Sequence, residues 1–175
     1  MKPSLTDALC TGCALCCDGS LFADVELAGR AEATRMEIMG LEIEDHDADG
    51  ELLVLPCAAL QGKRCGIYAH RPGCCRTFEC RLLQDAQRGA VGVERAQELI
   101  ADALQKIARV KRLLEQLGQR DERLPLKERC AEALVMKAPS NPDLVLKQAE
   151  LEVAMSAVET LILKTFLRGQ EIGRR

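Results

Sequence analysis

The sequence predicts a mainly α-helical protein with minimal strand, in which a loop-rich N-terminal region packs on a C-terminal helical bundle. Nine of its ten cysteines lie between residues 10 and 80, where glycine and proline interrupt the short elements. Beyond that stretch, an apolar seven-residue repeat runs through residues 93–117. A strong helix start, Asn-Pro-Asp at residues 141–143, precedes a second long apolar face. We therefore expect two domains, a cysteine-rich domain over residues 1–85 and a helical region over residues 86–175.

The N-terminal region is expected to contain only short elements. A helix is predicted over residues 24–39, with Asp24 as its N-cap. Residues 42–50 are interpreted as an acidic solvated loop, because they lack the D-x-[DN]-x-[DN]-G spacing of a calcium loop. A short strand is predicted over residues 51–55. Residues 57–80 contain little apolar surface, so we expect them to be organised by the metal that their cysteines share.

The C-terminal half is expected to form two long helices with a shorter one between them. The second long helix is predicted from Pro142 to Gly169, and the shorter one over residues 126–137, where Cys130 is expected to be buried. Packing within the chain explains the apolar faces, so a small bundle that closes over the cysteine region is the favoured interpretation. The alternative is a homodimer or a protein partner bound along residues 93–117. The apolar seam of that segment has a period of 3.5 residues and consists of Val93, Ala96, Ile100, Ala103, Ile107, Val110, Leu114 and Leu117.

Composition and charge exclude several classes of function. Aromatic residues make up 2% of the chain and the net charge is −3, so neither base stacking nor a general phosphate-binding surface is expected. We therefore predict no nucleic-acid partner. No segment approaches the ~18 consecutive apolar residues of a membrane helix, and the N-terminus lacks the apolar core of a secretory signal. The chain is therefore expected to be cytoplasmic and to have no membrane partner.

The cysteines themselves carry the strongest functional signal. Thiolates crowded this closely repel one another, and a bound metal ion or iron–sulfur cluster would neutralise and organise them. Disulfides are the alternative, but cytosolic thiols stay reduced and adjacent cysteines fit disulfide geometry poorly. The sequence therefore predicts a metal-binding protein with a two-part site. Its ligands are a C-x2-C-x2-C-C run, Cys10, Cys13, Cys16 and Cys17, and a second group, Cys57, Cys65, Cys75 and Cys80.

Spacing alone leaves the metal open. Cys10, Cys13 and Cys16 form a triple such as a [4Fe–4S] cluster uses, whereas Cys17 points elsewhere and would serve a second metal. Eight thiolates satisfy two tetrahedral zinc ions, and they also satisfy one cluster with thiolates to spare. The predicted cofactor is therefore either an iron–sulfur cluster, such as [4Fe–4S], or zinc.

Charged residues within the second cysteine group are candidates for a supporting role. Arg71 and Arg76 would offset the negative charge of the thiolates through their guanidinium groups. The alternative is that each arginine pairs with a nearby carboxylate, such as Glu79. His46 and His70 are expected not to bind metal, because eight thiolates are available.

Together these motifs resemble the YkgJ-like cysteine-cluster family, which is described as a zinc- or iron-chelating domain. The resemblance covers about residues 10–80 and rests on the C-x2-C-x2-C-C opening, Pro56-Cys57, the Cys-Gly-Ile-Tyr-Ala-His-Arg-Pro sequence of residues 65–72 and the Cys-Arg-Thr-Phe-Glu-Cys sequence of residues 75–80. It implies that the eight cysteines named above occupy the family's cysteine positions. Cys74 departs from the pattern, which has an apolar residue there. The motif is also similar to that of a flagellin-lysine methylating enzyme, which favours iron–sulfur and leaves catalysis open.

Three functions therefore stand as hypotheses. The first is a metal-binding protein that coordinates iron or zinc, and the second is an iron–sulfur protein for electron transfer or protein modification. The third is an interaction module, in which structural zinc staples the N-terminal region and the C-terminal helices bind a protein partner. Whether the chain is an enzyme stays open, since the sequence offers neither a Cys/His/Asp arrangement nor a glycine-rich phosphate loop.

Overall fold

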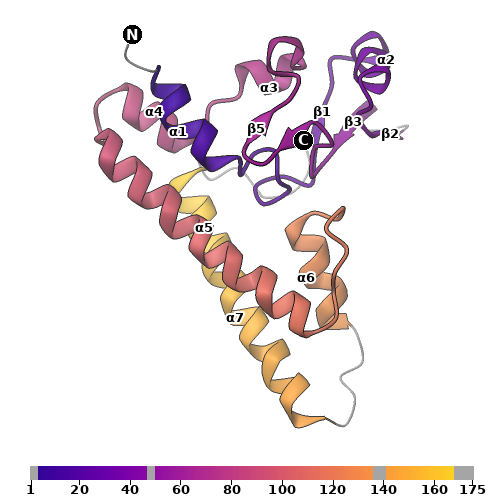
Figure 1. Ribbon diagram of the computed structural model, residues 1–175, viewed down its shortest axis with the longest axis vertical. Coiled ribbons are helices and arrows are strands. Elements are labelled where there is room, and N and C mark those ends of the chain that lie inside the picture. The colour runs from indigo at the N-terminus through magenta and orange to yellow at the C-terminus, as the bar shows by residue number, and fades with distance from the viewer. Residues whose placement is uncertain (1–3, 47–49, 136–140, 168–175) are drawn as a thin grey trace.

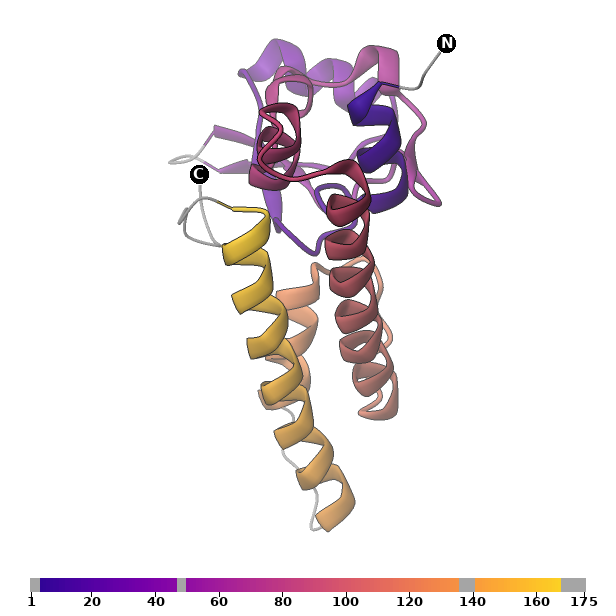
Figure 2. The same cartoon turned by 90° about the vertical axis from the view of Figure 1, so that its left-hand side faces the viewer.

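The computed structural model of the chain describes residues 4–46, 50–135 and 141–167. Two long antiparallel helices, α5 (Val93–Gln116) and α7 (Pro142–Thr165), lie side by side, and the shorter α6 (Leu126–Val135) packs against both. The small elements of the N-terminal region gather at one end of these helices, as the two views in Figure 1 and Figure 2 agree. The structure is mainly α-helical with little strand, which confirms the predicted fold class.

The N-terminal region consists of short helices and two small sheets. Three antiparallel strands form one sheet in the order β1-β3-β2, and β4 and β5 form a hairpin. The elements are α1 (Leu5–Cys13), β1 (Asp24–Glu26), α2 (Arg30–Ile38), β2 (Ile43–His46), β3 (Gly50–Val54), β4 (Leu60–Gln61), β5 (Arg64–Cys65), the 3-10 helix η1 (Tyr68–His70), α3 (Gly73–Thr77) and α4 (Arg81–Gln87).

The predicted long helices are confirmed. α7 begins where expected, because the Asn141 side chain accepts a hydrogen bond from the Asp143 amide at 3.0 Å. Along α5, the seam residues Ala96, Ile100, Ala103, Ile107, Val110 and Leu114 are buried within the chain. Because this seam packs chiefly on α7 and α1, intramolecular packing accounts for its apolar face.

Two hydrophobic cores of unequal size support the fold. The larger core joins α5, α6 and α7, and it also takes in Leu9 of α1 and Leu15 behind it. The smaller core lies between α2 and the three-stranded sheet and consists of Leu27, Ala33, Met36, Leu41 and Leu53. Residues 1–85 therefore contribute to both cores, so the larger core runs across the predicted boundary at residue 85.

The prediction of a helix over residues 24–39 is wrong at its N-terminal end. Residues 24–26 form strand β1, paired with β3, and α2 begins only at Arg30. Pairing with β3 satisfies the backbone of this segment and lets Val25 and Leu27 pack in the smaller core. Ile38, the last residue of α2, is 81% exposed.

Two other features of the N-terminal region differ from the predictions or add to them. Residues 43–46 of the predicted acidic loop form β2, while residues 47–49 lie outside the described residues. The predicted strand is confirmed as β3. The helix α1 was not predicted, although Ser4 and Asp7 form a capping box at its start.

Within the described ranges, no helix is both long enough and apolar enough to cross a bilayer.

Candidate metal centre

The C-terminal end of α1 presents the first cysteines. Cys10 and Cys13 lie on α1 about one turn apart, and the helix ends at Ala14, whose φ of 63° reverses the chain. The amides of Cys17 and Asp18 both donate to the Ala14 carbonyl, at 2.8 and 3.1 Å. This tight turn brings the end of the C-x2-C-x2-C-C run back towards the helix that carries its beginning.

Hydrogen bonds attach the next cysteine segment to this turn. The Cys57 amide donates to the Cys17 carbonyl at 2.8 Å. The hairpin of β4 and β5 carries Cys65, and the ammonium group of Lys63 beside it donates to the Gly12 carbonyl at 2.9 Å. Both contacts join segments that are far apart in the sequence, so Cys57 and Cys65 are held next to the first cysteines.

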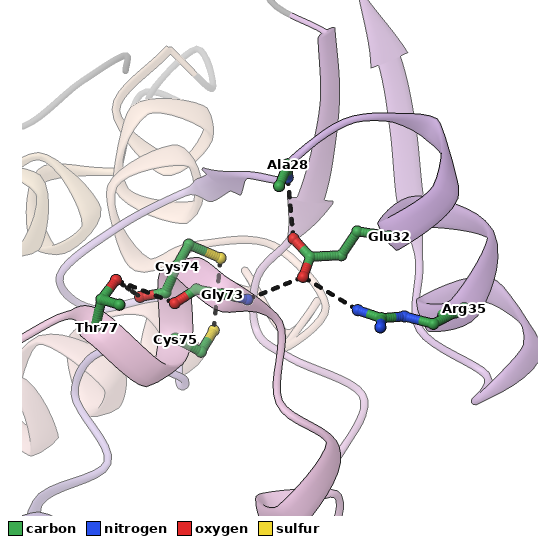
Figure 3. A network of polar contacts seen from close by, with 7 residues as sticks. All are labelled: Ala28, Glu32, Arg35, Gly73, Cys74, Cys75 and Thr77. Carbon is green, nitrogen blue, oxygen red and sulfur yellow. Dashed lines mark hydrogen bonds and ion pairs between the residues drawn. The ribbon is translucent and has the colours of Figure 1, made fainter.

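A buried carboxylate fixes the position of the third segment, as Figure 3 shows. Glu32 on α2 is 8% exposed, and its two oxygens accept hydrogen bonds from the Ala28 and Gly73 amides, both at 2.9 Å. The Arg35 guanidinium lies 3.2 Å from the same carboxylate. Burial opposes ionisation, but the two amides and the guanidinium outweigh it and lower the pKa of Glu32. Because Gly73 begins α3, ionised Glu32 determines where α3 places Cys75.

Cys80 is anchored to the helical bundle instead. It is the N-cap residue of α4, and the next amide, that of Arg81, donates to the Phe166 carbonyl at the end of α7 at 2.8 Å. Just before it, the Phe78 ring packs edge-on against Phe22 with ring centroids 5.2 Å apart. Cys80 itself packs against the larger core.

Electrostatic repulsion shows which thiols are neighbours near α1. Burial raises the pKa of Cys10 to about 11, and repulsion from Cys80 and Cys17 adds to the rise. Burial also raises the pKa of Cys13 to about 12, with further contributions from Cys80 and Cys10. The pKa of Cys16 is raised by its hydrogen bond with Cys17, by burial, and by repulsion that includes Cys13 and Cys10. We refer to Cys10, Cys13, Cys16 and Cys80 as the first set.

The remaining thiols repel one another in the same way. Burial raises the pKa of Cys57, and repulsion from Cys17 and Cys65 adds to it. The pKa of Cys75 is raised by its hydrogen bond with Cys74, by burial, and by repulsion that includes Cys17 and Cys57. We refer to Cys17, Cys57, Cys65 and Cys75 as the second set. Each set contains four of the eight predicted ligands, and Cys80 joins the first triple rather than its neighbours in the sequence.

The two sets meet at two adjacent residues. The Sγ atoms of Cys16 and Cys17 are 3.8 Å apart. Their hydrogen bond lowers the pKa of Cys17 to about 7 and raises that of Cys16. Metals bound by the two sets would therefore be close neighbours.

The sulfur atoms are gathered but not closed around one point. Among the residues that the structure describes, no group of three or more His, Cys, Asp or Glu side chains is placed to hold a metal ion. Thiols whose pKa is raised are protonated at neutral pH, so binding a metal requires their protons to leave and their side chains to converge. The donors nevertheless fit a soft metal ion, because each set offers four cysteine sulfurs on residues that are exposed or partly buried.

Arg71 is a cation that acts on both sets. Its charge opposes the rise in the pKa of Cys10 and contributes to the lowered pKa of Cys17. The guanidinium lies 3.8 Å from the centre of the Tyr68 ring, and its Nε donates to the Tyr68 carbonyl at 3.2 Å. It also donates to the Cys75 carbonyl at 3.4 Å. Arg71 thus lies among the cysteine segments, and its role in offsetting the charge of the thiolates stays a prediction.

The other charged candidates are one arginine and the two histidines. The charge of Arg76 contributes to the lowered pKa of Glu32, and its role beside the thiolates stays a prediction. His70 is exposed at the end of η1, and His46 lies at the end of β2.

Two cysteines outside the predicted ligand set have contrasting surroundings. The Sγ of Cys74 lies 4.0 Å from that of Cys75, and Cys74 packs against the smaller core. Cys130 is 3% exposed in the larger core, as predicted.

A comparison of the sequence with models of known protein families matches residues 9–97, just over half of the chain. The matching family is described as "CxxCxxCC: Putative zinc- or iron-chelating domain". The chain belongs to this family. The match supports metal binding and contains all eight predicted ligands of the CxxCxxCC domain, from Cys10 to Cys80. Searches of curated proteins and of solved structures gave no match.

The sequence analysis missed Glu32. Its signal was present, because a glutamate three residues after the N-cap commonly turns back to bond an amide before the helix. Here Gly29 is the N-cap and Glu32 bonds the Ala28 amide. The predicted helix began at Asp24, which placed Glu32 in the helix interior and concealed this role.

Proposed function

We propose that the chain is a metal-binding protein that holds two zinc ions, each through four cysteine thiolates. One ion would be bound by the first set and the other by the second set. The observation that supports this division is that Cys80 repels Cys10 and Cys13, whereas Cys17 repels Cys57 and Cys75. Cys17 also repels Cys10 and Cys16, so the two groups adjoin at Cys17. Four thiolates are the complete ligand set of a structural zinc ion.

The surrounding charges support two such ions. Four thiolates and one dication carry a net charge of about −2, so two sites side by side need nearby cations. Arg71 reaches both sets, and the ammonium group of Lys63 is held at the end of α1 by the Gly12 carbonyl. When bound, zinc would supply a fixed tetrahedral junction and no redox chemistry.

The metal would act as an organiser of the N-terminal domain, residues 1–85. The first set joins α1 to α4, whereas the second set joins the turn after α1 to the hairpin and to α3. Only five residues form the smaller core beneath the second set. A core of that size stabilises little, so binding energy from the metal would supply much of the order in this part of the chain.

Metal analysis of protein purified without oxygen tests the proposal. We expect a colourless protein with about two zinc ions per chain, which corresponds to eight thiolates shared four to an ion. A brown protein with acid-labile sulfide would contradict zinc and support the iron–sulfur hypothesis, including electron transfer or protein modification.

Matched cysteine variants test the division into two sets. We expect Cys75→Ser and Cys80→Ser each to lose one of the two ions, because each removes one ligand of four. Cys74→Ser is the control for its neighbour and should keep both ions, and Cys130→Ser should also keep both. If Cys80→Ser and Cys75→Ser weakened the same single site, the division would be wrong.

A further inference from the structure

An arginine buried on α6 has a guanidinium nitrogen without a hydrogen-bond partner. Arg129 is 4% exposed, and the unpartnered nitrogen is its Nε. Among the described residues, its guanidinium forms no hydrogen bond and no ion pair within 4 Å, although its charge helps to lower the pKa of Asp121. Removing such a cation from water without an anionic partner costs several kcal/mol. The protein therefore retains a group that is costly to bury unless something else pairs with it.

Arg129 lines two adjoining hollows. The larger, of about 290 Å³, is also lined by Glu115, Arg120 and Glu122. The smaller, of about 150 Å³, has apolar walls that include Leu124 and Leu126. Their combined size suits a small molecule, and their one shared cation is Arg129.

The charges around the hollows limit what can bind. Lys111 is already engaged, because its ammonium lies 3.6 Å from the Asp18 carboxylate. Arg120 remains as a second cation at the larger hollow, whereas Glu115 and Glu122 are exposed at its edge. The two carboxylates would repel a long polyanion, so a small anionic group is the favoured ligand.

We propose that this crevice binds a small oxyanion, a carboxylate or a phosphate group, through the Arg129 guanidinium, with Arg120 as a second cation in the lining. A guanidinium presents parallel N–H donors that match two oxygens of either group. The apolar wall of the smaller hollow would accept the carbon portion of such a ligand.

The crevice shares a wall with the cysteine segments. Two residues that line the smaller hollow are neighbours of cysteines in the sequence. Asp18 directly follows Cys17, and Pro56 directly precedes Cys57. The Leu126 amide donates to the Gly19 carbonyl at 3.0 Å. The oxyanion site is therefore contiguous with the turn that carries the C-x2-C-x2-C-C run, although the inference does not depend on which metal binds there.

Isothermal titration with the full-length, metal-loaded protein tests the site. The probes are inorganic phosphate and acetate, each added at constant ionic strength against chloride. We expect one saturable site for at least one probe, and Arg129→Met should weaken it by about tenfold or more. Arg123→Gln is the matched control, because Arg123 is exposed, pairs with Asp121 and does not line either hollow.

The two probes distinguish the sources of the ligand group. Binding of phosphate alone would identify phosphorylated ligands, and binding of acetate alone would identify carboxylates. If neither probe binds up to about 50 mM, or if Arg129→Met binds as tightly as the unaltered chain, the proposal is wrong.

Thermal unfolding without any probe gives a second, independent readout. If Arg129 is unpaired in the free protein, Arg129→Met removes a buried charge and should raise Tm by about 2–4 °C. A fall in Tm would mean that Arg129 already pairs with a carboxylate of the chain, such as Glu122, and would overturn the proposal.

Discussion

The two ends of this molecule are held together in different ways. In the helical bundle, Leu114, Leu151, Ile162 and Phe166 are almost completely buried in one large core. Around the cysteines, the smaller core has five residues, and the eight candidate thiol ligands are exposed or only partly buried. Apolar packing can therefore account for the bundle, whereas the cysteine end depends on polar anchors and, in our proposal, on metal.

Metal removal should produce the largest difference in protease sensitivity between the two ends of the molecule. After complete chelation under reducing conditions, we expect residues 57–80 to become sensitive to proteases while α5 and α7 stay protected. Structural zinc contributes about 10–16 kcal/mol of apparent binding energy in small zinc domains, far more than five core residues can replace. Limited proteolysis with mass spectrometry, together with far-ultraviolet circular dichroism, measures both ends at once. Unchanged cleavage after verified metal loss would show that the metal does not organise this region.

A core substitution in the bundle should have the opposite pattern. Ile162→Ala removes a side chain that is 1% exposed, and we expect it to lower the free energy of unfolding by about 2–5 kcal/mol. The ion of the second set should stay bound, because Ile162 lies in the larger core, against which Cys13, Cys16 and Cys80 of the first set pack. Val145→Ala is the control, since Val145 is 52% exposed on α7. Loss of the ion of the second set from Ile162→Ala would mean that the two ends are more tightly coupled than their cores indicate.

Glu32 should matter at the cysteine end alone. Glu32→Gln keeps the size of the side chain but removes its negative charge. That charge strengthens the hydrogen bond from the Gly73 amide and forms the ion pair with Arg35. We expect a loss of about 1–3 kcal/mol in stability and a metal affinity about 10–100-fold weaker at the second set. Glu37→Gln on the same helix is the control, because Glu37 is more exposed and pairs with Arg30 at 3.7 Å. Equal effects of the two substitutions, measured by competition with a chelator, would count against a positioning role for Glu32.

The same contrast explains what the sequence could predict. The seven-residue repeat of residues 93–117 and the Asn-Pro-Asp start of α7 are local patterns whose burial follows from one period, and both helices formed as expected. The ligand types were equally visible, because cysteine spacing is local. The proposed grouping was not, since Cys80 comes close to Cys10 through the packing of α4 on α1 and through the hydrogen bond from Arg81 to Phe166. Such contacts depend on tertiary packing that no window of sequence contains.

Strand β1 illustrates the same limit. Asp24 is a suitable helix cap, and the residues after it can form a helix. Register with β3 nevertheless directs Val25 and Leu27 into the smaller core, and this long-range pairing prevails over the local preference. The prediction was therefore correct where periodicity determines structure and wrong where a partner strand does.

The smallest expected effect concerns alkaline pH and lies in the bundle. Burial raises the pKa of Cys130 from its ordinary value of 9.0 to about 11, with Arg129 opposing the rise and Glu159 adding to it. Between these values the unfolded chain releases the thiol proton while the folded chain keeps it. The unfolded state then binds fewer protons than the folded state, so stability falls as pH rises. Through this one thiol, the free energy of unfolding falls by at most about 1.4 kcal/mol per pH unit.

Urea unfolding at pH 8 and pH 10 should therefore show a smaller loss of stability for Cys130→Ala than for the unaltered chain. Because the other cysteines titrate equally in both proteins, the difference between the two losses isolates Cys130. An identical loss in both would show that this thiol does not contribute to the pH dependence of the bundle.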